Sequence, residues 1–375
     1  MPRIEAPGAA TVAPRKIGEL DSIRGLAALL VVVYHLPSWH GDLHDLRAIR
    51  NLYLMVNLFF VLSGFVIALN YEDRLISIKE LARFQLLRLG RLYPVHLLFL
   101  VLFALLAVGK WLAATRLHMA LPNTTVLEPF PTHEFIEHLF LVQALGVFPD
   151  ARSLNGPSWS ISVEFYTYLV FGVLCLMLDK RYRPIAFLML GAAALLPIIT
   201  LGDAVGEYTS ILQCLAGFFI GSLTATLSNR IHVTISAWPA LLTLLAMALF
   251  LCLKSDEQYD FLFYLLSAVL IIAVVHARDS RFRAALRSPA LAYLGLISYS
   301  IYMSHSLIVW VVNQGVRVLL KRPESLTRGL SYPRLSPVEA WLGYGAVIGG
   351  TLLVSALVFK LIEDPVRRRS RQLLL

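Results

Sequence analysis

Charged residues are scarce in this sequence. Lysine, arginine, aspartate and glutamate make up 15% of its 375 residues, whereas hydrophobic residues make up 58%. Soluble proteins carry roughly 25% charged residues, and a soluble domain of this size could not bury so much apolar surface. The hydrophobic residues also gather in blocks of ~17–25 residues, the length that crosses the hydrocarbon core of a bilayer. The sequence therefore disfavours a soluble domain and predicts an all-α, polytopic protein whose first partner is the lipid bilayer.

Cysteine is also rare. The three cysteines, Cys175, Cys214 and Cys252, lie inside apolar blocks and show no Cys-x-x-Cys spacing. This pattern disfavours a disulfide framework and a zinc site, and we expect no metal and no permanently bound cofactor. The net charge is +9, but the basic residues flank apolar blocks and form no continuous stripe. We interpret them as topology signals and do not expect nucleic acid as a partner.

Ten apolar blocks are candidate membrane spans. They cover roughly residues 20–37, 51–70, 92–112, 158–178, 184–201, 207–228, 236–253, 260–276, 289–313 and 339–362. If the N-terminus faces the cytoplasm, the connections on that side carry 20 lysines and arginines and those on the other side carry 11. This excess places both termini in the cytoplasm. Connection 314–338 carries five basic residues on the outer side. Either this segment is an exception to the excess of basic residues on the cytoplasmic side, or it faces an anionic partner.

The chain reads as one membrane domain over residues 17–369. The preceding segment, 1–16, is rich in alanine and proline, and we expect it to be a disordered cytoplasmic N-terminus. Residues 370–375 are expected to form a short cytoplasmic tail. No feature of the sequence specifies an oligomeric state.

Two ionisable residues interrupt the first span. Arg24 and His35 are eleven positions apart, and eleven helical steps of about 100° return to nearly the same face, ~16 Å further along the axis. Ionisable groups inside spans are costly and tend to mark function. The spacing predicts one shared cavity, with Arg24 near the cytoplasmic surface and His35 in the outer part of the membrane. The alternative is an arginine that snorkels and an interfacial histidine.

A carboxylate, Glu164, lies in the fourth span within GPSWSISVEFYTYLV, residues 156–170. The span enters from the outside, so Glu164 should lie at a depth similar to that of His35. A buried carboxylate needs a partner, and it could orient the His35 imidazole as a general base. The alternative is a structural ion pair with an arginine.

Three arginines precede Pro94 at the cytoplasmic start of the third span: Arg83, Arg88 and Arg91. Guanidinium groups there could hold phosphates through charge-assisted hydrogen bonds. Arg88 and Arg91 are spaced i, i+3 on one helix face, on the same side of the membrane as Arg24. The alternative is ordinary positive-inside flanking.

The ninth span is unusually polar. Tyr299, Tyr302 and His305 recur at steps of three, and four serines accompany them, at positions 298, 300, 304 and 306. This pattern fits either a polar-lined cavity or packing by small hydroxyl residues. In the second span, Ser63 and Gly64 form a small-residue pair that favours close helix approach.

Six motifs together resemble the acyltransferase-3 family of bacterial membrane proteins. In chain order they are the pair Arg24 and His35, FFVLSGF over 59–65, RLGRLYP over 88–94, WSISVE over 159–164, YSIYMSH over 299–305, and IEDPVRR over 362–368. Each motif alone is weak, but six in the family's order are specific. The resemblance covers roughly residues 17–369. Many members also carry a hydrolase-like domain, and from the resemblance we expect the stand-alone form without it.

The resemblance implies an O-acyltransferase in the bacterial cytoplasmic (inner) membrane. Its donor would be acyl-CoA, usually acetyl-CoA, bound from the cytoplasm, and its acceptor a hydroxyl of an extracytoplasmic sugar or polysaccharide. Carried over residue by residue, the expected catalytic residues are His35 and Glu164, and the expected donor-binding residues are Arg24, Arg88 and Arg91. Residues expected to bind the acceptor or line the cavity are Ser63, Trp159, Ser160, Tyr299, Tyr302 and His305. A pantetheine arm could bridge the ~16 Å between Arg24 and His35.

Other functions fit the same buried charges. A proton-coupled transporter or a lipid-linked sugar flippase could also bury histidine, arginine and glutamate, although the two halves of the chain show no symmetry. The sequence leaves open the acceptor, the choice between acetyl and succinyl transfer, and the choice between direct transfer and an acyl-histidine intermediate.

Overall fold

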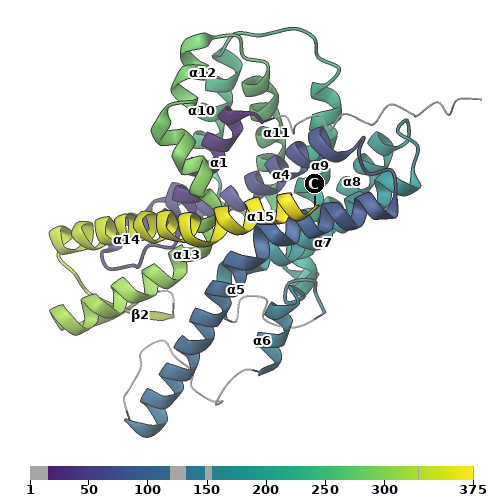
Figure 1. Cartoon of the computed structure of the whole chain (residues 1–375). Helices are drawn as coiled ribbons and strands as arrows, with labels where there is room; N and C mark the ends of the chain where they lie inside the picture. Colours follow the sequence, from purple (N-terminus) through teal and green to yellow (C-terminus); the bar gives the residue numbers. More distant parts are fainter. Residues whose placement is uncertain (1–15, 119–131, 148–153, 328, 375) are drawn as a thin grey trace, which may run out of the picture.

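The structure, a computed structural model, describes residues 16–118, 132–147, 154–327 and 329–374. Of the segment expected to be disordered, 1–16, all but Lys16 lies outside the described residues. Helices form nearly all of the regular structure (Figure 1). The elements are α1 (Gly18–Tyr34), α2 (Gly41–Asp45), α3 (Arg47–Arg50), η1 (Asn51–Leu54), α4 (Met55–Tyr71), α5 (Ile78–Arg116), α6 (Thr132–Leu139), η2 (Gly156–Ser158), α7 (Trp159–Met177), α8 (Arg183–Leu201), η3 (Gly202–Tyr208), α9 (Thr209–Ser228), α10 (Trp238–Leu253), η4 (Glu257–Tyr259), α11 (Phe261–Val275), α12 (Ser280–Leu286), α13 (Pro289–Leu320), β1 (Glu324–Thr327), β2 (Leu330–Pro333), α14 (Pro337–Val358), the π-helical η5 (Phe359–Glu363) and α15 (Asp364–Leu374).

The polytopic all-α architecture is confirmed in outline. Within the described parts of the chain, 8 helices are long and apolar enough to cross a membrane. The shorter α1, of 17 residues, and the apolar α10, of 16 residues, cover the first and seventh predicted spans. Counting both gives the ten predicted spans, whereas length and composition alone support eight.

Two sides of the bundle can be named from α1. We call the side at which α1 begins the near side and the side at which it ends the far side. The second and fourth predicted spans, α4 and α7, begin on the far side, as the sequence predicts. Residues near both ends of the described chain, Lys16 and Arg371, line the same cavity, so both ends lie on the near side.

Glycines bring the central helices into contact. A Cβ added to Gly64 in α4 would lie 1.9 Å from the carbonyl oxygen of Phe218 in α9, and one added to Gly221 would lie 2.1 Å from that of Val61. These distances leave no room for a side chain, so the close approach predicted for the Ser63–Gly64 pair is confirmed. Gly25 of α1 meets Gly295 of α13 in the same way, at 2.5 Å.

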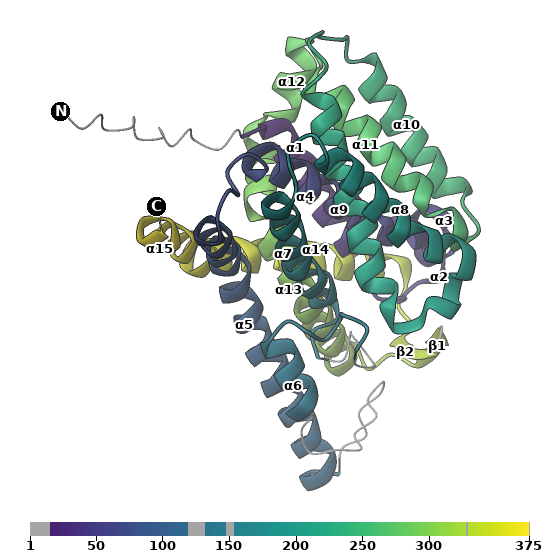
Figure 2. The ribbon, with the colours of Figure 1, turned by 90° about the vertical axis from the view of Figure 1, so that its right-hand side faces the viewer.

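Helix α5 differs from the third predicted span. It runs unbroken for 39 residues through Pro94 and begins 14 residues before the predicted span, so all three arginines lie within the helix. At ~1.5 Å per residue it is about twice as long as a bilayer core is thick, and it extends beyond the other helices (Figures 1 and 2). At the other end of the chain, residues 370–374 of the expected tail continue α15.

Two arginines of the basic connection 314–338 pair with nearby glutamates. Its first residues extend α13, and β1 and β2 then form an antiparallel hairpin, a small addition to the all-α prediction. Arg317 lies 2.9 Å from Glu324, and Arg322 forms an ion pair with Glu339. Local carboxylates thus offset part of the positive charge that the topology rule disfavours on this side.

Candidate active site

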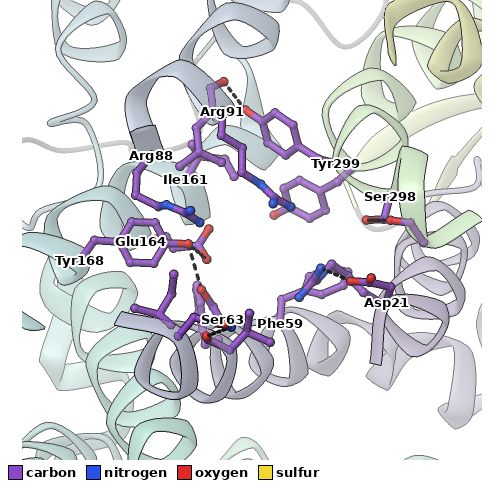
Figure 3. Close-up of a pocket in the computed structure, with 18 of the residues that line it drawn as sticks. Asp21, Phe59, Ser63, Arg88, Arg91, Ile161, Glu164, Tyr168, Ser298 and Tyr299 are labelled. Atoms are coloured by element: carbon purple, nitrogen blue, oxygen red, sulfur yellow. Dashed lines mark hydrogen bonds and ion pairs between the residues drawn. The ribbon is translucent and has the colours of Figure 1, made fainter. Parts of the chain in front are cut away.

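A cavity of about 400 Å³, which we call the near cavity, lies between α1, α4, α5, α7, α13 and α15. Figure 3 shows Arg88 and Arg91 reaching into it from α5, opposite Phe59 and Ser63 of α4. Asp21 enters from α1, and Ser298 and Tyr299 from α13 (Figure 3). Arg24, also on α1, lines the same cavity. The predicted donor-binding arginines therefore meet in one cavity, although they come from two helices far apart in sequence.

Each arginine of this group is held by a neighbour or aimed at the cavity. Arg24 donates to Asp21 Oδ1 at 3.1 Å, one turn earlier in α1. Arg88 donates to the Tyr71 hydroxyl at 3.0 Å, and its guanidinium lies over the Tyr71 ring, 5.2 Å from the centroid. Stacked and hydrogen-bonded guanidinium groups are pre-oriented, which suits them to bind phosphate oxygens.

Glu164 belongs to a hydrogen-bonded chain in the wall of the near cavity. The Tyr168 hydroxyl donates to Glu164 Oε1 at 2.6 Å. Since that hydroxyl has one hydrogen, Ser63, whose Oγ lies 2.9 Å away, donates to the tyrosine oxygen. These hydrogen bonds join α4 to α7 and hold the Glu164 carboxylate in the cavity that the three predicted donor-binding arginines also line (Figure 3).

A second cavity, of about 940 Å³, lies on the far side; we call it the far cavity. His35, Trp159 and Tyr302 line it, together with residues from the connections between helices. Its other polar lining residues are Tyr34, Arg47, Arg50, Asn51, Tyr53, Asn57, Thr209, Gln213, Lys254, Ser255, Glu257, Asp260 and Ser306.

His35 lies at the end of α1 in a defined tautomer. Its Nδ1 lies 2.9 Å from the carbonyl oxygen of Val31. A carbonyl only accepts hydrogen bonds, so Nδ1 carries the proton and Nε2 is the basic nitrogen. The His305 ring lies behind it, with the ring centroids 4.7 Å apart. His305 is fully buried, and its Nδ1 donates to the Tyr302 carbonyl at 2.7 Å.

The two cavities meet at a thin boundary. Val56 and Tyr302 line both of them. Ser160, in the wall of the near cavity, donates to the Tyr302 hydroxyl at 2.8 Å. Val56, and Tyr302 with its serine partner, therefore lie between the arginine-rich cavity and the one that contains His35.

The structure separates two residues that we expected to act together. Glu164 lines the near cavity and His35 the far cavity, and no hydrogen bond joins them among the described residues. Arg83 also stands apart from the other arginines, since it lines neither cavity and lies 3.8 Å from Glu80. The remaining candidates line the near cavity, except Trp159 in the far cavity and His305 behind His35.

Sequence reasoning missed a buried network in the far cavity. Lys254 Nζ lies 2.6 Å from Asp260 Oδ1 and donates to the Tyr53 hydroxyl at 2.5 Å. Tyr53 in turn donates to Asp260 Oδ2 at 2.8 Å. These residues lie at span ends, where charge is ordinary, so their burial left no signal. In the near cavity, the site prediction included neither Arg367 nor Arg371 of α15, although both line it. Arg367 belongs to the IEDPVRR motif, whereas no motif included Arg371.

Comparisons with known proteins agree with this architecture. The acyltransferase-3 model, described as an acyltransferase domain, matches residues 17–360. The chain is similar to O-acetyltransferase OatA of Staphylococcus aureus strain NCTC 8325 / PS 47, with 24% identity over 382 residues, 95% of this chain and 58% of that protein. A protein of S. aureus strain COL, named only provisionally as an O-acetyltransferase, is 26% identical over an alignment of 397 positions. The alignment covers 94% of this chain and 58% of that protein.

The chain thus spans 58% of the length of these two relatives. No solved structure matches it. The family match covers most of the sequence and includes five of the six motifs in full. The chain belongs to the acyltransferase-3 family.

Proposed function

We propose that the protein is an integral-membrane O-acyltransferase of the bacterial cytoplasmic membrane. It moves an acyl group, most simply acetyl, from cytoplasmic acyl-CoA to a hydroxyl of an extracytoplasmic sugar or polysaccharide. The observation that carries the proposal is the pair of cavities that meet at Tyr302, with guanidinium groups on one side and a basic histidine nitrogen on the other. The family and the names of the relatives support acyl transfer, and O-acetylation in particular.

The donor occupies the near cavity. The excess of lysine and arginine in the near-side connections makes that side the cytoplasmic one, where acyl-CoA is available. Arg24, Arg88 and Arg91 bind the CoA phosphates through charge-assisted hydrogen bonds. The rise of α1 separates Arg24 from His35 by ~16 Å, and the pantetheine arm spans this distance, passing Tyr302 to bring the thioester to His35.

The acceptor reaches the thioester through the far cavity. His35 Nε2 takes the proton from the acceptor hydroxyl as its oxygen attacks the thioester carbonyl carbon. The new C–O bond replaces the C–S bond, and the departing thiolate takes up a proton, so acyl ester and free CoA result. The Val31 carbonyl holds the ring in the tautomer that this step requires.

Glu164 acts on the donor side in this proposal. With Tyr168 and Ser63 it forms a fixed acceptor of hydrogen bonds facing the arginines. Its negative charge limits the repulsion among three guanidinium groups when no donor is bound. The rings that lie against His35 are those of His305 and Tyr34, whereas Glu164 lines the other cavity.

The test uses purified protein in lipid nanodiscs with [14C]acetyl-CoA. We expect release of free CoA and transfer of label to a carbohydrate hydroxyl, both lost in His35→Ala while the variant remains folded in the membrane.

Two cavities on opposite sides also fit a carrier, so the same protein is reconstituted into sealed vesicles. Sugar flux without CoA release would reject the acyltransferase and favour the carrier or the flippase. To identify the acceptor, glycans from a deletion strain and its parent are compared by mass spectrometry.

A further inference from the structure

A pair of arginines, Arg47 and Arg50, lines the far cavity. Arg47 and Arg50 lie i, i+3 on α3, so they share a face, and both are exposed and line the cavity. Within the described residues neither forms an ion pair. Arg317 and Arg322, on the same side of the protein, are both paired with glutamates.

The other charged groups in the far cavity do not cancel this pair. Lys254 and Asp260 neutralise each other at 2.6 Å. Glu257 is the remaining carboxylate in the lining. Two guanidinium groups therefore face one carboxylate in the cavity that also contains His35, and the excess is positive.

The wall that carries the arginines is held in place by buried hydrogen bonds. Asn51, which follows Arg50 directly, donates to the Leu251 carbonyl at 2.9 Å and to the Lys254 carbonyl at 3.1 Å. The Tyr53–Lys254–Asp260 network closes the same wall. These bonds fix the backbone from which the two arginines extend, so this wall keeps its shape when a ligand binds.

The remaining lining suits a polyhydroxylated ligand. Asn57, Gln213 and Thr209 supply neutral donors and acceptors, and Trp159 and Tyr34 supply aromatic faces. Such a mixture of few charged, several neutral polar and some aromatic groups is typical of specific small-molecule sites. Planar guanidinium groups add recognition of a carboxylate or phosphate.

We propose that the far cavity selects an acidic carbohydrate acceptor, whose carboxylate or phosphate binds Arg47 and Arg50 while one of its hydroxyls faces His35. This inference rests on the proposed function, because it assigns the acceptor to the far cavity. It names the acceptor's chemical class: a sugar that carries an anionic group, and not a neutral glycan.

The experiment measures binding separately from turnover. Full-length protein in phosphatidylcholine nanodiscs is titrated calorimetrically with matched oligosaccharides on glucose, galactose and mannose backbones. Each set contains the neutral sugar, its C6 carboxylate and its C6 phosphate, so the two anion sources are distinguished. We expect a charged sugar to bind about 10- to 100-fold more tightly than its neutral partner, the range of charge-assisted hydrogen bonds.

Variants then locate the effect. R47Q/R50Q should abolish the preference for the charged sugar and leave acetyl-CoA binding unchanged, and R47K/R50K should retain part of the preference. Arg334→Gln, which removes an exposed far-side arginine outside both cavities, is the matched control and should behave as wild type. If R47Q/R50Q does not fold, the single variant R50Q carries the comparison.

The outcomes separate this inference from the proposed function. If a charged sugar binds but is not acetylated, the Arg47–Arg50 anion site is supported and the proposed O-acyltransferase function is rejected. If charged and neutral sugars bind equally well and are acetylated equally well, the O-acyltransferase function is supported and the anion site is rejected. The site is also rejected if no charged sugar binds. A second set of nanodiscs contains added phosphatidylglycerol, and loss of all sugar binding there would also reject the site, because the arginines would then be a contact for anionic headgroups.

Discussion

The near and far cavities share a boundary but are built differently. The near cavity takes most of its polar lining from the bodies of membrane-spanning helices, with arginines from α1 and α5 and a carboxylate from α7. The far cavity takes its charged lining from connections: α3 and the segment from Lys254 to Asp260. Charge inside a span is rare and therefore visible in a sequence, whereas charge in a connection is expected. The same kind of binding site was thus predictable on one side and hidden on the other.

The largest expected effect comes from a substitution in α4, the helix that lines both cavities. In Gly64→Leu the new side chain would begin 1.9 Å from the Phe218 carbonyl oxygen, so α4 and α9 must separate. We expect a loss of at least about 3 kcal/mol, seen as a lower melting temperature and less protein in the membrane. Gly109→Leu is the control, since nothing lies within 4 Å of a Cβ there. Equal stability of the two variants would contradict the close packing that we describe.

The next largest effect is specific to the far cavity. His35→Ala should lower kcat for acyl transfer by about 10²–10⁴, the usual contribution of a general base. The affinity for acyl-CoA should stay within a factor of about two of wild type, because the phosphate site lies on the other side of Tyr302. His232→Ala, at an exposed histidine outside both cavities, should be silent. A variant that transfers acyl groups at near wild-type rate would remove His35 from the mechanism.

A smaller effect is specific to the near cavity. Arg88→Ala should raise the KM for acyl-CoA about 10- to 100-fold, since a charge-assisted hydrogen bond contributes roughly 1.5–3 kcal/mol, and it should change kcat much less. Arg83→Ala is the matched control on the same helix, because Arg83 faces Glu80 and lines neither cavity. Similar KM values for the two variants would show that helix charge in general, and not the cavity, attracts the donor.

The smallest effect tests where Glu164 belongs. Glu164→Gln keeps an acceptor for the Tyr168 hydroxyl, so we expect a change in the KM for acyl-CoA of only a few-fold. The pH profile of kcat should not move, because His35 lies in the other cavity. A shifted profile would instead support the direct partnership of Glu164 and His35 that the sequence indicates, and would blur the distinction between the two sides.

Much of the fold and part of the site could be predicted from the sequence. Apolar block length indicated the spans, and the eleven-residue spacing placed Arg24 and His35 toward the same side of α1. The single shared cavity predicted from that spacing is wrong, because Arg24 lines the near cavity and His35 the far cavity. The small pair at Ser63 and Gly64 indicated close packing, which α4 and α9 show. The correct predictions succeed because they depend on helical periodicity and on the cost of placing charge in a bilayer, both of which act locally along the chain.

Other features depended on how distant segments meet. Depth along a span suggested that Glu164 would reach His35, but the rotation of α7 directs it to Tyr168 and the near cavity. Lys254 is buried because Tyr53, from a segment 201 residues earlier, packs against it beside Asp260 of its own connection. Periodicity sets the face and the height of a residue within its own helix, whereas the rotation of one helix against another is decided by side-chain packing and close glycine contacts between segments far apart in sequence.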